Sequence, residues 1–331
     1  NPSAMWAAAA CTSRPLLPVP GPPMIRTVPR NPGLRTAASV SSAGAGSGLV
    51  MPASHHGGLT SRPFWQHEAV THDLHLHRYG PPGPVRVLAL HGLTGHGRRW
   101  RTLATRHLPE IALAAPDLLG HGRSSWSAPW TFDANVAALA TLIENEAEGP
   151  VLVVGHSFGG AVGLHLAAAC PDLVSGLLLL DPAIGLDGQW MREIADAMLT
   201  SPDYTDRDEA RTEKFTGVWA DVALEELDDD LDEHLIALPN GRYGWRISVP
   251  AMMSYWSELA RDIVLPRNGT PTTLVRAQWT SPPYISEELI EGLSGRLGAD
   301  FTMVDLPCQH MVAQAKPAET AALIRDMLGR G

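Results

Sequence analysis

From residue 64 onward, short hydrophobic runs alternate with amphipathic segments. Apolar runs or strict apolar–polar alternation predict strands at 70–77, 85–90, 111–117, 150–154, 177–180, 272–276 and 301–306. Helical spacing of apolar residues predicts helices at 98–107, 132–146, 160–170, 286–297 and 317–328. Because strands and helices alternate along the chain, we expect an α/β fold with a mostly parallel, doubly wound sheet covered by helices on both faces.

Two segments depart from this alternation. Residues 1–63 are rich in Pro, Gly, Ser and Ala and show no periodicity, which predicts a flexible leader. Residues 187–262, here called the insertion, are helical in pattern, acidic, and rich in Trp and Met. We therefore expect an α/β core from 64–186 and 263–331, with the insertion forming a helical lid at one end of the sheet.

Composition and charge exclude several classes of protein. The chain has 331 residues, of which 44% are hydrophobic, and a formal net charge of −10. No basic cluster suits nucleic acid, and no apolar run is long enough to cross a membrane. The three cysteines show no paired spacing, which argues against a disulfide framework or a zinc site and favours a cytoplasmic protein. The oligomeric state stays open.

The most specific motif is Gly155-His156-Ser157-Phe158-Gly159, which has the form G-x-S-x-G. It lies between a buried strand and a helix of small residues. This context is typical of a nucleophile elbow, in which a serine projects from a tight strand-to-helix turn. Amide groups at the start of the helix favour negative charge that develops beside the serine.

Three further loops follow a known order. They are the His-Gly loop at 91–100, the D-x-x-G-x-G-x-S loop at 117–124, and the Cys-Gln-His loop at 308–310. With the elbow, they make the chain resemble a serine hydrolase of the α/β-hydrolase fold over residues 64–330. The resemblance implies Ser157 as nucleophile, His310 as base, and the backbone N–H groups of Leu93 and Phe158 as the oxyanion hole. It implies neither a cofactor nor a metal.

The position of the third catalytic residue departs from the family's common pattern. Most relatives carry an Asp in the loop that here spans 276–285, where no carboxylate occurs. Asp181 ends the strand after the nucleophile helix, and a minority of the family places its acid there. We therefore expect Asp181 to be the acid, because the ends of parallel strands meet at one edge. Glu287 or Glu288, or an incomplete triad, remain alternatives.

The insertion supplies candidates for the substrate pocket. Its large side chains are Trp190, Met191, Trp219, Trp245, Met252, Met253 and Trp256, of which two or three should line a pocket. Trp190, Met191, Trp219, Met253 and Trp256 are the candidate substrate-binding residues. The acidic run at 227–234 is interpreted as a solvated helix face. The alternating histidines His72, His75 and His77 are interpreted as a solvated strand rather than a metal site.

These observations predict a serine hydrolase that cleaves a carboxylic ester or lactone of a small, largely apolar molecule through an acyl-enzyme. Three other functions remain open. A thioesterase and a C–C bond hydrolase use the same catalytic residues. A binding protein of the same fold, with little turnover, would fit an incomplete triad.

Overall fold

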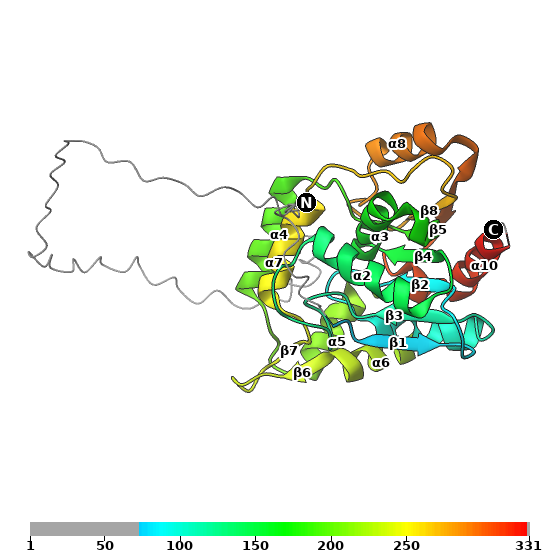
Figure 1. Ribbon diagram of the computed structural model, residues 1–331. Coiled ribbons are helices and arrows are strands. Elements are labelled where there is room, and N and C mark those ends of the chain that lie inside the picture. Colours follow the sequence, from blue (N-terminus) through cyan, green and yellow to red (C-terminus); the bar gives the residue numbers. More distant parts are fainter. Residues whose placement is uncertain (1–72, 330–331) are drawn as a thin grey trace, which may run out of the picture. The chain divides into compact units, whose positions relative to one another are not determined.

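The computed structural model describes residues 73–329, so the predicted leader at 1–63 and residues 64–72 lie outside the described part. Its main feature is a sheet of seven strands in the order β1-β3-β2-β4-β5-β8-β9 (Figure 1). The strands are β1 (Leu76–Tyr79), β2 (Val87–Leu90), β3 (Leu113–Pro116), β4 (Val151–His156), β5 (Val174–Leu180), β8 (Thr272–Ala277) and β9 (Phe301–Leu306). β1 pairs with β3 antiparallel, whereas the other neighbours in this sheet are parallel. The expected α/β fold with a mostly parallel sheet is confirmed.

Both faces of the sheet are buried, as the continuous apolar runs predict. Side chains of β2 alternate between the two cores: Leu88 and Leu90 enter one, and Val87 and Ala89 enter the other. The first core is covered by α2 (Phe132–Glu146), α3 (Phe158–Ala169) and α8 (Glu287–Leu297). The second is covered by η1 (Gly97–Trp100), η2 (Leu103–His107), α9 (Val312–Ala315) and α10 (Pro317–Leu328).

Residues 98–107, predicted to form one helix, do not form a regular α-helix in the structure. The segment forms a short 3₁₀ turn, η1, followed by a single π-helical stretch, η2. The adjacent residues Arg98 and Arg99 of η1 bind carboxylates of the insertion. These tertiary contacts involve the residues at which the predicted regular helix would begin.

The chain between β5 and β8 contains four helices: α4 (Gly188–Thr200), α5 (Arg207–Thr216), α6 (Leu224–His234) and α7 (Val249–Leu259). Side chains of Asp187, Asp206 and Ser248 cap the first turns of α4, α5 and α7. α4 and α7 lie side by side (Figure 1). A hairpin of β6 (Leu235–Ala237) and β7 (Tyr243–Trp245) was not predicted, although the Asn240-Gly241 pair is a hairpin signal.

Candidate active site

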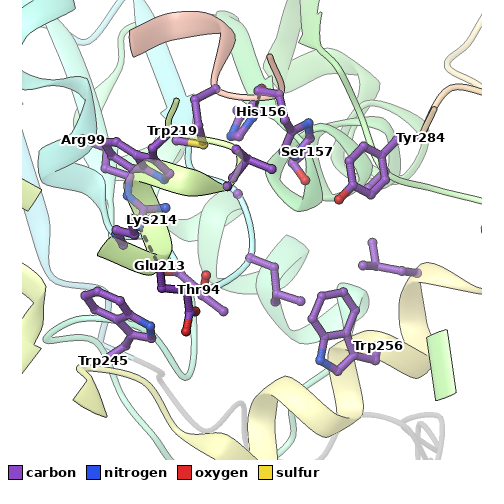
Figure 2. A pocket seen from close by; sticks show the side chains of 18 residues that line it. Thr94, Arg99, His156, Ser157, Glu213, Lys214, Trp219, Trp245, Trp256 and Tyr284 are labelled. Carbon is purple, nitrogen blue, oxygen red and sulfur yellow. Dashed lines mark hydrogen bonds between the residues drawn. The ribbon is translucent and has the colours of Figure 1, made fainter. Parts of the chain in front are cut away.

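Ser157 occupies a sharp turn between β4 and α3. Its backbone has φ 54° and ψ −118°, a conformation that non-glycine residues rarely adopt. Side chains at the flanking glycines would collide with the backbone, since a Cβ at Gly155 or Gly159 would lie 2.4 Å from the carbonyl oxygen of Gly159 or Leu90. The turn thus has the geometry expected of a nucleophile elbow, and Ser157 lines a cavity of about 130 Å³ (Figure 2).

His310 lines the same cavity and is bound to Asp181. The Nδ1 atom of His310 lies 2.7 Å from Oδ2 of Asp181, which follows the last residue of β5. Two other donors hold this carboxylate: the N–H of Ala277 at 3.2 Å and the hydroxyl of Thr280 at 3.0 Å. Because a carboxylate only accepts hydrogen bonds, Nδ1 carries the proton and Nε2 of His310 is left free to act as a base.

The loop at 276–285, which carries no carboxylate, contacts Asp181 at the end of β5. Thr280 lies in this loop, and its hydroxyl donates to Asp181. The two reserve candidates, Glu287 and Glu288, are exposed in the first turn of α8. Of the carboxylates considered from sequence, Asp181 is the one that contacts His310.

His156 fixes the backbone beside the candidate base. Its Nε2 atom lies 2.8 Å from the carbonyl oxygen of His310, and the two imidazole rings are 4.6 Å apart. Burial, aided by the neighbouring His310, holds the pKa of His156 well below its usual range. The ring is therefore neutral and donates a hydrogen bond to that carbonyl.

Tyr284 packs against the other side of the candidate base. Its ring centre is 4.4 Å from that of His310 and 5.6 Å from that of Trp190, on which it stacks. Figure 2 shows Tyr284 beside Ser157 at one end of the cavity. No sequence motif predicts this contact.

The two expected oxyanion donors lie in different segments, one at the start of α3 and the other in the loop after β2. Phe158 is the first residue of α3, so its N–H has no partner within the helix. Leu93 is a central residue of a turn closed by a 3.0 Å hydrogen bond from the Gly95 N–H to the Gly92 carbonyl. Leu93 lines the cavity, and the next residue, Thr94, has φ 57°.

Helix α6 binds the turn that contains Leu93 and Thr94. The prediction that its acidic run at 227–234 is a solvated face is therefore wrong. Asp230, Glu233 and His234 are buried. Nε2 of His234 lies 3.0 Å from the carbonyl oxygen of Thr94. Asp230 accepts hydrogen bonds from His96 at 2.9 Å and from Nε of Arg99 at 2.6 Å.

Charge balance explains why an acidic residue can be buried here. Asp230 is also bound by Lys214 of α5. Burial alone would raise the pKa of Asp230, but Arg99 and Lys214 outweigh it and hold that pKa well below the usual range. The insertion and the loop after β2 are thus joined by a buried cluster of charged groups.

The cavity lining contains some of the expected aromatic residues. Trp219 and Trp256 line it, and so does Trp245 (Figure 2). Trp190, Met191 and Met253 do not line it: Trp190 reaches it only through Tyr284, and Met191 is 2% exposed in the core. Three of the seven large side chains singled out from sequence thus face the cavity.

One wall of the cavity is polar. The Lys214 ammonium lies 4.6 Å and 4.2 Å from the ring centres of Trp219 and Trp245, and Arg99 and Glu213 line the same side. Burial lowers the pKa of Lys214 to about 8. Among residues 73–329, the side chains close enough to share a metal ion are His75, His77 and Asp117, and none of them lines the cavity.

None of the helices in the described part of the chain combines the length and apolar character needed to span a bilayer.

Known proteins similar to this chain were found by sequence and by structure. Lipase LipV of Mycobacterium tuberculosis (strain ATCC 25618 / H37Rv) is 67% identical over 257 residues, which cover 78% of this chain and 98% of the relative. Esterase Rv0045c of the same organism is 41% identical over 106 residues, or 31% of this chain and 35% of the relative. The crystal structure of E-2-(acetamidomethylene)succinate hydrolase covers 79% of this chain and 97% of its own, with a TM-score of 0.68 and 21% identity, so it shows a shared fold. The sequence profile of the alpha/beta hydrolase family matches residues 87–323, and this chain belongs to that family.

Proposed function

We propose that the chain is a serine hydrolase that cleaves small, largely apolar carboxylic esters or lactones through an acyl-enzyme. The observation that carries the proposal is that one cavity brings together Ser157 on its strained turn and His310, which is bound to Asp181 at 2.7 Å. A serine hydroxyl needs such a base because it is too weakly acidic to attack a carbonyl unaided.

In the proposed reaction, Nε2 of His310 takes the proton of Ser157 as its oxygen attacks the ester carbonyl. Asp181 keeps Nδ1 protonated and stabilises the imidazolium that forms. The N–H groups of Leu93 and Phe158 bind the negative oxygen of the tetrahedral intermediate. His310 then protonates the departing alkoxide, and a water molecule, activated in the same way, releases the acid. The reaction draws only on these groups and water.

One feature supports an ester as the substrate, and a second bears on the length of its acyl group. Two of the relatives that match in sequence are named a lipase and an esterase. The cavity is small, about 130 Å³, and its walls include Ala183, Trp256 and Leu259. Because drug-sized ligands need roughly 300 Å³ or more, short acyl groups fit this cavity better than long chains.

The first test is labelling with a fluorophosphonate, followed by intact mass measurement. The wild-type chain should gain one adduct, Ser157→Ala none, and the control Ser175→Ala, an exposed residue of β5, one. No adduct on the wild type would remove the serine mechanism and favour a binding protein of the same fold.

The substrate class is tested with p-nitrophenyl esters of increasing acyl length, together with a lactone and an acyl thioester of matched acyl group. We expect the highest kcat/KM with a short ester. A clear preference for the thioester would replace the ester assignment, while leaving the serine mechanism intact.

A further inference from the structure

Histidines on the edge strand β1 meet the carboxylate that follows β3. In the antiparallel register, Leu76 pairs with Pro116 and His77 with Ala115, which places His75 opposite Asp117. The hydrogen bond from the Asp117 N–H to the His75 carbonyl, 2.8 Å, continues this ladder. Because side chains alternate along a strand, His75, His77 and Asp117 share one face of the pair.

The potential ligand atoms of these three side chains lie within 4.8 Å of one another. Nε2 of His77 is 3.3 Å from Oδ1 of Asp117, and it is buried without a hydrogen-bond partner. Two ligands of a tetrahedral metal ion, each about 2.0–2.1 Å from it, are separated by about 3.3–3.4 Å. The pair therefore already has the spacing of two such ligands.

The carboxylate is held in place by other groups. Oδ1 of Asp117 accepts from the Gly97 N–H at 2.7 Å, and Oδ2 accepts from the Arg123 N–H at 2.8 Å. Each oxygen keeps a second lone pair for a metal. The nearby guanidinium of Arg123 is paired with Glu233, which also binds Arg98. Such outer hydrogen bonds orient the ligands of protein metal sites.

We propose that His75, His77 and Asp117 bind one divalent first-row transition-metal ion, such as Zn²⁺, Co²⁺ or Ni²⁺. Two imidazoles and one carboxylate suit these ions, and water completes the coordination. The site does not line the cavity, so the ion takes no part in ester cleavage. It joins β1 to the end of β3 and, through Gly97, to the loop after β2.

The test is titration of the full chain, freed of metal by a chelator, with Co²⁺, followed by visible absorption and calorimetry. We expect one Co²⁺ per chain. Loss of an outer hydrogen-bond partner alone weakens metal sites by about 10–100-fold, so removing a ligand in His75→Ala or His77→Ala should weaken binding by about 100-fold or more.

Two controls separate this site from other histidines. His107→Ala changes a half-buried histidine of η2, and a His55→Ala/His56→Ala double variant changes a pair near the N-terminus. Both should bind Co²⁺ like the wild type. Binding that is lost in the double variant, unchanged in His75→Ala and His77→Ala, or absent from the wild type at millimolar Co²⁺ would overturn the proposal.

A second measurement guards against misfolding of the variants. In the wild type, Co²⁺ should protect the half-buried His75 from modification by diethyl pyrocarbonate, as read by peptide mass spectrometry. Equal modification with and without Co²⁺ would overturn the proposal even if the variants failed to fold.

Discussion

Replacing Asp181 by Asn tests the candidate triad most directly. The carboxylate is 1% exposed and lies 2.7 Å from Nδ1 of His310. When His310 takes the serine proton, an ion pair forms whose charge centres are about 4 Å apart, worth about 4 kcal/mol at an effective dielectric constant of about 20. An amide supplies no such charge, so kcat should fall by about 10³-fold. KM should change little, because Asp181 acts on the transition state through His310.

The assay is steady-state hydrolysis of a short p-nitrophenyl ester by Asp181→Asn and by a matched control, Asp305→Asn. Asp305 is also at the end of a strand, but it is exposed and pairs with Arg276 at 2.8 Å. Such surface pairs contribute only about 0–1 kcal/mol, so the control should retain wild-type kcat. If Asp181→Asn kept more than about a tenth of the wild-type kcat while Ser157→Ala was inactive, the electrostatic reasoning would be refuted.

Three further changes test the surroundings of the site. Thr280→Val removes the 3.0 Å hydrogen bond to Asp181 and should lower kcat by about 10-fold at nearly constant KM in the same assay; an unchanged kcat would contradict the role assigned to that bond. Asp230→Asn leaves the cations of Arg99 and Lys214 without a counter-charge and should lower the free energy of unfolding in urea by about 3–5 kcal/mol. An unchanged urea midpoint would show that Asp230 does not stabilise these two cations. Burial lowers the pKa of His121 to about 4, so between pH 6.5 and 4 the unfolded chain binds more protons and stability falls as pH falls. His121 should account for about 2 kcal/mol of the loss between pH 7 and 5, and His121→Gln should flatten that part of a urea-midpoint profile; a profile parallel to the wild type would refute this.

The fold is readable from the sequence wherever packing follows a simple period. The run at 301–306 and the helix at 317–328 coincide with β9 and α10, because α10 buries one apolar face and the apolar side chains of β9 pack, partly buried, against the cores. Prediction fails where contacts from distant parts of the chain decide the local structure. The segment 98–107 is the main case, since Arg98 and Arg99 bind α6, more than 130 residues further along the chain.

In the candidate site, too, residues in local motifs could be predicted, whereas contacts from distant parts of the chain could not. Ser157 and His310 lie in motifs that can be recognised locally. Asp181 is inferred from three things together: the missing carboxylate at 276–285, the acid position of a minority of the family, and the rule that the ends of parallel strands meet at one edge. Thr280 and Tyr284 support the site from a loop whose approach to β5 and to His310 no periodic pattern encodes.

The acidic composition of α6 suggests a solvated helix, whereas the spacing of its residues indicates a buried face. Leu227, Asp230, Leu231 and His234 follow the i, i+3, i+4, i+7 pattern of one helix face, and all four are buried. An aspartate on that face needs a cation, and Arg99 supplies one from the loop that also carries Leu93. Because this buried ion pair and the His234–Thr94 hydrogen bond both end on that loop, the insertion does more than line part of the cavity. Its position is tied to the turn that presents the proposed oxyanion donor, so changes in α6 should affect catalysis as well as substrate binding.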